Sequence, residues 1–173
     1  MPIEVKEKPK YAIVAAVQLP SVNDVEFEAS LTELRELAKT LGYKVVSTFV
    51  QKRSSFDTTA YLGVGKRQEI RGFVHNDSEY TEYAESVVNA DNREIDVILV
   101  DHEISPSQAR NLENEIGCEV MDRTMVILEI FHRNARSRAA RAQVEIARLG
   151  YMAPRLREAA KLAGPQGRQR SGV

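Results

Sequence analysis

A glycine-rich stretch, GVGK at residues 63–66, is the first place in the chain where residue types and spacing suggest chemistry. A phosphate loop of the Walker type needs a glycine five residues before its Gly-Lys pair and a Ser or Thr directly after the lysine. Ala60 and Arg67 stand at those positions, so the stretch does not match. We interpret it as a tight turn, with glycine at positive φ, ahead of a helix. It is a weak candidate for binding an anion at that helix start, through Gly63, Gly65 and Lys66.

A cluster of titratable residues, Asp101-His102-Glu103, directly follows the apolar run DVILV. Such groups serve acid–base catalysis or metal ligation, and open α/β sheets place their sites at the carboxyl ends of strands. Adjacent residues at a strand end point in different directions, however, so solvated loop residues are the simpler interpretation. His75 and His132 lie far away in the sequence. We expect no catalytic residue, no metal site and no cofactor in this chain.

Arginine is concentrated in the last quarter of the sequence. From residue 133 onward there are ten Lys or Arg and only two acidic residues, whereas residues 1–132 hold fourteen basic and twenty-three acidic residues. The formal net charge of −1 therefore hides an acidic part and a basic part. Arg-rich clustering of one sign indicates a polyanionic partner such as nucleic acid, and a solvated helix face is the alternative.

Alternating strands and helices must position these residues. Short apolar or β-branched runs predict strands over residues 11–18, 44–51, 96–101 and 118–122. Helices are predicted over residues 27–41, 67–74 and 107–116, and the acidic residues 75–94 allow one more. Ser105 should cap the third helix, with Pro106 in its first turn and Gly117 as its stop. The alternation predicts an α/β fold, a small parallel sheet flanked by helices.

The basic part follows as two helices with a turn near residues 134–137. Their apolar stripes are Val126, Ile127, Ile130 and Phe131 in the first helix and Ala140, Val144, Ala147 and Tyr151 in the second. Stripes that face each other predict a long antiparallel helical hairpin. Pro154 should kink or break the second helix. Several arginines would crowd at the hairpin tip.

The chain divides into four segments. We expect a flexible lead-in over 1–10, an α/β sheet subdomain over 11–121, a helical hairpin subdomain over 122–163 and a Gly- and Arg-rich linker over 164–173. The single cysteine, Cys118, excludes an internal disulfide. Neither a signal peptide nor an apolar stretch of membrane length is present, so we expect a cytoplasmic protein without a membrane partner.

Five motifs, in order, resemble one family. They are YLGVGK (61–66), SPSQARNLE (105–113), DRTMVILEIF (122–131), ARSRAARAQVEIARL (135–149) and YMAPRL (151–156). Together they are similar to the N-terminal domain of the HflX GTPases, over residues 11–167. The resemblance implies an α/β domain, a helical hairpin, a Gly-rich linker and then a GTPase (G) domain, which this chain lacks. GTP and Mg²⁺ would belong to that G domain, so we expect this chain alone to hydrolyse no GTP.

The resemblance also implies partners. The family binds the large ribosomal subunit and separates stalled or stress-damaged ribosomes, with the hairpin tip reaching rRNA. That role would fall on Arg133, Asn134, Ala135, Arg136, Ser137, Arg138 and Arg141. The chain has Ala139 and Ala140 where the family usually has an acidic residue and a glycine, and Ala142 where it usually has leucine, which makes the tip more basic and more helix-forming.

Two alternatives stay open at this point. The domain could instead pack on its own G domain and regulate it, with the basic tip incidental. It could also be a nucleotide-binding α/β domain that holds ATP at residues 63–66.

Overall fold

The computed structural model describes residues 8–76 and 93–171, with side chains to residue 158. Most of the helix predicted over 75–94 lies outside these residues. The strands are β1 (Lys10–Gln18), β2 (Tyr43–Lys52), β3 (Val97–Val100) and β4 (Glu119–Asp122). The helices are α1 (Asp24–Thr40), α2 (Val64–His75), α4 (Pro106–Ile116), α5 (Arg123–Asn134) and α6 (Arg138–Ser171).

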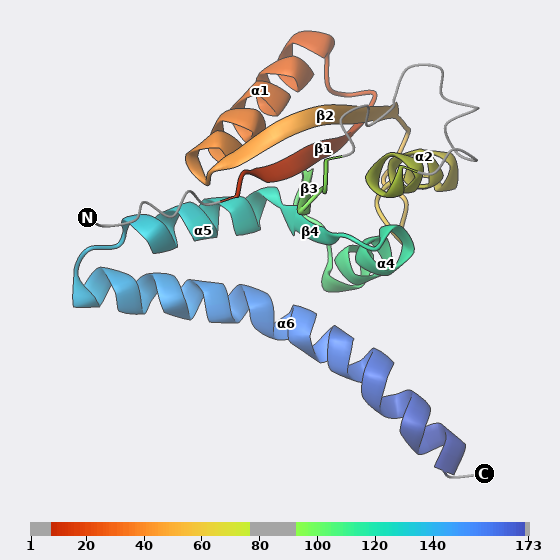
Figure 1. Cartoon of the computed structure of the whole chain (residues 1–173), viewed down its shortest axis with the longest axis vertical. Coiled ribbons are helices and arrows are strands. Elements are labelled where there is room, and N and C mark those ends of the chain that lie inside the picture. Colours follow the sequence, from red (N-terminus) through yellow and green to blue (C-terminus); the bar gives the residue numbers. More distant parts are fainter. Residues whose placement is uncertain (1–7, 77–92, 172–173) are drawn as a thin grey trace.

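The four strands form one parallel sheet in the order β2-β1-β3-β4 (Figure 1). This confirms the predicted α/β class with a small parallel sheet flanked by helices. The β1 strand is central, and its nearly continuous apolar sequence fits this place because both of its faces are covered. None of the helices in the described part of the chain is long and apolar enough to cross a membrane.

Alternation along β1 divides the core into two layers. Ile13, Ala15 and Val17 face a cluster built with α2 and α4. Their neighbours Ala12, Val14 and Ala16 face a second cluster built with α1 and α5. The sheet therefore lies between two helical layers, as a side-chain period of two requires when both faces are apolar.

Local capping fixes where α4 begins and ends, as predicted. The Ser105 hydroxyl accepts from the Gln108 N–H at 3.1 Å, and the Gln108 side chain accepts from the Ser105 N–H at 2.9 Å. Pro106 occupies the first turn, where its missing N–H has no consequence. Gly117 ends the helix at φ +76°, a left-handed conformation that glycine adopts readily.

The fully buried carboxylate of Asp122 joins the end of β4 to three other segments. One oxygen caps α5 by accepting from the Met125 N–H at 3.0 Å. The other accepts from the Ile104 N–H at 3.1 Å and from the Tyr151 hydroxyl of α6. It also lies 3.4 Å from a guanidinium nitrogen of Arg155. The loop after β3 and both basic helices therefore meet at one carboxylate.

The contact between α5 and α6 is more polar than the sequence pattern predicts. Arg148 of α6 pairs with Glu129 of α5 at 2.8 Å. Val126 of α5 is buried in the cluster beneath the sheet instead, while Phe131 is 57 % exposed. The expected facing of two apolar stripes is therefore wrong in part, because α5 lies on the sheet and turns its apolar side to it. The long antiparallel hairpin as a unit stays a prediction.

The backbone of α6 is continuous from Arg138 to Ser171. Pro154 does not end it, and Figure 1 shows a bend along the helix rather than a break. Residues 164–171, expected as linker, continue the helix. Adding residues to an existing helix avoids the unfavourable nucleation step, which favours this extension. The four-segment division stays a prediction.

Removing the Asp122 carboxylate should destabilise the fold more than removing any one partner. Asp122→Ala leaves the Arg155 guanidinium and two N–H groups without their acceptor, so we expect a loss of about 3–5 kcal/mol in the free energy of unfolding. Tyr151→Phe removes one hydrogen bond and should lose about 1–2 kcal/mol. Urea denaturation measures both.

Glu129→Gln is the matched control for these two variants. Its ion pair with Arg148 is partly exposed, so its loss should change stability by less than about 1 kcal/mol. A loss in Asp122→Ala no larger than that of this control would show that Asp122 does not anchor the fold.

Candidate functional site

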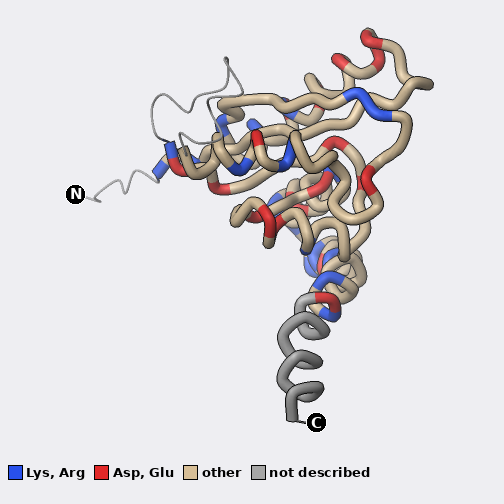
Figure 2. The backbone as a smooth tube through the Cα atoms, turned by 90° about the vertical axis from the view of Figure 1, so that its right-hand side faces the viewer, with Lys and Arg blue, Asp and Glu red and all other residues tan. Residues whose placement is uncertain are grey.

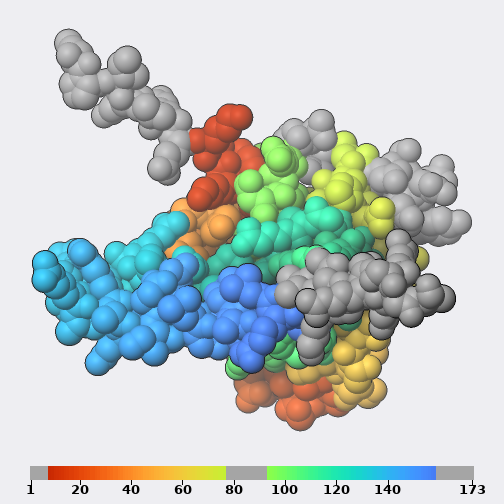
Figure 3. Space-filling model, turned by 90° about the horizontal axis from the view of Figure 1, so that it is seen from below, coloured from red at the N-terminus to blue at the C-terminus, as the bar shows by residue number. Residues whose placement is uncertain are grey.

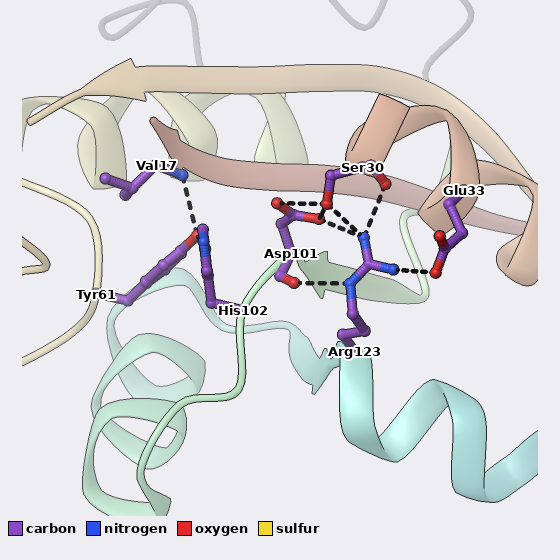
Figure 4. Close-up of polar contacts among 7 residues, drawn as sticks. All are labelled: Val17, Ser30, Glu33, Tyr61, Asp101, His102 and Arg123. Atoms are coloured by element: carbon purple, nitrogen blue, oxygen red, sulfur yellow. Dashed lines mark hydrogen bonds and ion pairs between the residues drawn. The ribbon is translucent and has the colours of Figure 1, made fainter. Parts of the chain in front are cut away.

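The carboxyl ends of β1 and β3 meet where the strand order reverses direction, the usual place for a site in an open α/β sheet. Polar side chains from four segments gather there (Figure 4). Asp101 and His102 follow β3, Ser30 and Glu33 come from α1, Tyr61 precedes α2, and Arg123 begins α5. Their contacts decide whether this crevice can do chemistry.

The guanidinium of Arg123 is engaged at all three nitrogens. Nη2 donates to Asp101 Oδ1 at 2.6 Å and to the Ser30 carbonyl at 2.7 Å. Nη1 donates to Glu33 Oε1 at 2.7 Å, and Nε donates to the Asp101 carbonyl at 3.0 Å. The Asp101 carboxylate also accepts from the Ser30 hydroxyl at 3.0 Å. This network ties the first residue of α5 to α1 and to the end of β3.

The His102 imidazole is fixed by a chain of hydrogen bonds. The Val17 N–H donates to the Tyr61 hydroxyl at 2.9 Å. That hydroxyl can then donate to His102 Nδ1, 2.6 Å away, which places the imidazole proton on Nε2. Burial lowers the pKa of His102, the nearby charge of Asp101 opposes this, and Arg123 adds to it. Burial also raises the pKa of the Tyr61 hydroxyl.

Asp101 and His102 thus turn to different partners, as predicted for adjacent residues at a strand end. Asp101 is only 4 % exposed and is held by Arg123 and Ser30. The Nδ1 lone pair of His102 is occupied by Tyr61, and Phe56 packs against the imidazole with ring centroids 4.6 Å apart. These contacts favour a structural role over acid–base catalysis.

The glycine-rich stretch begins α2, with Gly63 as its N-cap. The Gly63 N–H donates to Gln51 Oε1 at 2.9 Å, and a Cβ at this position would lie 2.7 Å from Arg53 Nη1. A larger residue here would therefore require the Arg53 and Gln51 side chains to move. The predicted positive φ is wrong for Gly63, whose φ is −66°, because the left-handed residue of this turn is Tyr61 at +70°.

Two of the groups in this stretch that could attract an anion have protein partners. Lys66 Nζ pairs with Glu69 at 3.0 Å, and the Gly63 N–H is taken by Gln51. Arg67, at the position of the Walker Ser or Thr, is buried and donates to the Leu62 carbonyl at 2.7 Å. Anion binding by Gly63, Gly65 and Lys66 stays an untested prediction.

The predicted rRNA-contacting residues lie around the turn between α5 and α6. Arg133 Nη1 donates to the Leu41 carbonyl at the end of α1, 3.0 Å away. The Ser137 hydroxyl accepts from the Ala140 N–H at 3.0 Å and so caps α6. The side chains of Asn134, Arg136, Arg138 and Arg141 are exposed. Figure 2 marks the Lys and Arg positions along the chain.

Sequence reasoning missed the role of Arg123. Its partners Ser30 and Asp101 lie 93 and 22 residues away, so no spacing rule links them. The positive φ of Tyr61 had no local signal either, because a bulky aromatic residue rarely adopts it.

Acidification should weaken the fold through His102. Its pKa is lowered in the folded state, so the unfolded chain binds this proton more tightly. The contribution of His102 to the free energy of unfolding is therefore largest above the unfolded pKa of about 6.5, and it falls as the pH drops below that value. We expect the unfolding free energy of the wild type to decrease from pH 7 to pH 5 more than that of His102→Gln, in urea titrations. Equal decreases would assign the pH dependence to another group.

The chain is similar in sequence to known GTPases. The family model described as GTP-binding GTPase N-terminal matches residues 28–132. GTPase HflX of Gluconacetobacter diazotrophicus is 42 % identical over 187 residues, which cover 96 % of this chain and 41 % of that protein. GTPase HflX of Alkalihalophilus pseudofirmus is 43 % identical over 133 residues, covering 77 % of this chain and 28 % of the relative. The chain thus spans well under half the length of these relatives.

Solved structures are similar over most of the chain. A GTP-binding protein from the archaeon Sulfolobus solfataricus, in complex with GDP, is 26 % identical with a TM-score of 0.57, covering 94 % of this chain and 43 % of that one. A mutation variant of SsGBP is 28 % identical with a TM-score of 0.60, covering 87 % and 41 %. The chain therefore belongs to the GTP-binding GTPase N-terminal family, as an N-terminal domain of the HflX type.

Proposed function

We propose that this domain binds the large ribosomal subunit through rRNA, as part of a cytoplasmic HflX-type GTPase that separates stalled ribosomes under stress. In this proposal α5 and α6 work as an antiparallel hairpin, and the turn between them is the contact point. The observation that carries it is the set of exposed arginines at that turn: Arg136, Arg138 and Arg141.

These arginines suit contact with RNA. No carboxylate pairs with Arg136, Arg138 or Arg141 among the residues that the structure describes, so their charge is available to a partner. A guanidinium stays charged, binds phosphate through two parallel hydrogen bonds and stacks on bases. Arg141 donates to the Ala135 carbonyl within the turn at 3.3 Å. Arg133 donates to the Leu41 carbonyl instead, which ties it to the sheet subdomain.

The root of the hairpin supports the same proposal. Asp122 and Arg123 fasten the start of α5 to the sheet, to α1 and to α6. A probe that reaches into RNA needs a base held by packed elements, since a loose support spreads the positions of the contacting groups.

GTP and Mg²⁺ belong, in this proposal, to the remainder of the parent protein. The chain spans 41 % of its Gluconacetobacter relative, and residues 63–66 have neither the phosphate-loop spacing nor a free lysine. This domain alone then hydrolyses no GTP. The G domain would be its partner within the parent chain.

A regulatory role toward that G domain is a second candidate. On α6 three apolar side chains are exposed: Ile146 at 70 %, Leu149 at 58 % and Leu156 at 62 %. Exposed apolar residues at helical spacing are typical of a surface that another domain covers. ATP binding at residues 63–66 gains no such support, because Lys66 is paired with Glu69.

Charge reversal at the tip should separate binding from folding. The triple variant Arg136→Glu, Arg138→Glu and Arg141→Glu changes exposed residues, so each should alter stability by about 0.5 kcal/mol or less. Each lost charge-assisted contact with RNA is worth about 1.5–3 kcal/mol, so binding should weaken by more than about 100-fold. Cosedimentation with large ribosomal subunits and thermal melting measure the two effects.

The matched control replaces three exposed lysines of α1 and β2 with Glu: Lys39, Lys44 and Lys52. It alters the net charge by the same amount and should leave binding largely intact. The proposal fails if the tip variant cosediments like the wild type, and a loss in both triple variants would point to overall charge instead.

The salt dependence of binding should report how many arginines reach phosphates. Three contacts predict a slope of about −2 to −3 in a plot of log affinity against log salt concentration. Arg133→Gln should leave that slope unchanged, because its guanidinium is bound to Leu41. Binding that does not change with salt would favour an apolar protein contact and therefore the regulatory candidate.

A further inference from the structure

A cleft of about 520 Å³ lies between the free edge of β4 and α6. Its walls come from α4, β4, α5 and α6, with the starts of β1 and β2 at one end. Figure 3 shows α6 lying across this side of the molecule, next to the segments from α4 to α5. The volume falls in the range of small-molecule sites, roughly 300–1,000 Å³.

Side chains of α4 and α6 form hydrogen bonds to the edge of β4 that borders the cleft. Among the described strands, none pairs with the outward-facing peptide of Val120 on β4. Its N–H donates to Glu113 of α4 at 3.2 Å, and its carbonyl accepts from Arg155 of α6 at 3.3 Å. The strand edge is thus closed to another strand, and the space beside it is left for a smaller molecule.

The charge of the lining favours an anion. Five of its side chains are basic and three are acidic. Arg148 is neutralised by Glu129, and Arg155 by Asp122. Arg110 of α4 has no ion-pair partner in the described part of the chain, and its Nε is buried without a hydrogen bond. Because no carboxylate neutralises Arg110 there, its charge is available to an anion in the cleft that it lines.

The remaining lining is apolar and adaptable. It includes three methionines from β4, α5 and α6, with Leu41 and Tyr43 at the other end: Met121, Met125 and Met152. Methionine side chains are flexible and polarizable, and they fit irregular or aromatic groups without a fixed shape. A ligand that fits both the charged lining around Arg110 and the apolar lining has one anionic group and an apolar body.

We propose that this cleft binds a small organic anion, with its charged group on Arg110 and its apolar body on the methionines. Arg136, Arg138 and Arg141 do not line this site, whereas Arg133 does. The proposal does not depend on ribosome binding. Nothing in the carboxyl-end crevice around Arg123 takes part.

The test uses 8-anilinonaphthalene-1-sulfonate as the probe, followed by its fluorescence and by ¹H–¹⁵N NMR of the folded domain. We expect one saturable site, with amide shifts in α4, β4 and the part of α6 around Met152. The neutral analogue N-phenyl-1-naphthylamine carries the same rings without the sulfonate and should bind at least about tenfold more weakly.

Arg110→Met keeps an unbranched side chain as far as the fourth atom and removes the charged guanidinium. The variant should bind the sulfonate probe about tenfold more weakly than the wild type does, and it should bind the neutral analogue with unchanged affinity. Its melting temperature should not fall, because the wild-type guanidinium has a buried nitrogen without a partner. This separates loss of the site from loss of the fold.

The control variant Ile146→Ser with Leu149→Ser changes the exposed outer side of α6, where an apolar dye could also bind. It should leave the affinity and the NMR shifts unchanged. The proposal is wrong if this control abolishes binding, if Arg110→Met binds the sulfonate like the wild type, or if the shifts map outside the cleft.

Discussion

Two adjacent residues of opposite charge, at the junction of β4 and α5, hold the domain together. Asp122 turns toward α6 and the loop after β3, whereas Arg123 turns toward α1 and the end of β3. Buried charges are unfavourable unless they are fully hydrogen-bonded, so each of these contacts constrains its neighbours. The direction in which α5 leaves the sheet, and with it the course of α6, depends on this junction.

The arginines of α5, α6 and the turn between them include two groups with different surroundings. Arg123, Arg148 and Arg155 are each held by carboxylates near the root of the two helices. Those at the turn between α5 and α6 have no carboxylate partner among the described residues. Sequence composition counts both groups alike, yet only the second can offer its charge to another molecule. The basic character of the last quarter is therefore partly structural.

Local sequence signals predicted most of the fold. Apolar runs marked the strands, and Ser105, Pro106 and Gly117 marked the ends of α4, because these signals act over a few residues. The polar network was not predictable, since Arg123 meets Ser30 across 93 residues. The apolar stripe of α5 was recognised, but its partner was not, because periodicity gives the face of a helix and not what covers it. The tip residues were proposed from the family resemblance.

The closure of the β4 edge has a consequence for the order in which the chain is made. The strand is complete at residue 122, but its outer carbonyl is covered only when Arg155 of α6 arrives. Until then a nascent chain carries an open strand edge and a buried carboxylate that lacks two of its partners, Tyr151 and Arg155. Open edges invite pairing with other chains. The last helix, α6, is therefore the element that covers the edge of β4, and it is made last. A chain cut before Tyr151 would have a complete sheet whose β4 edge is prone to aggregation.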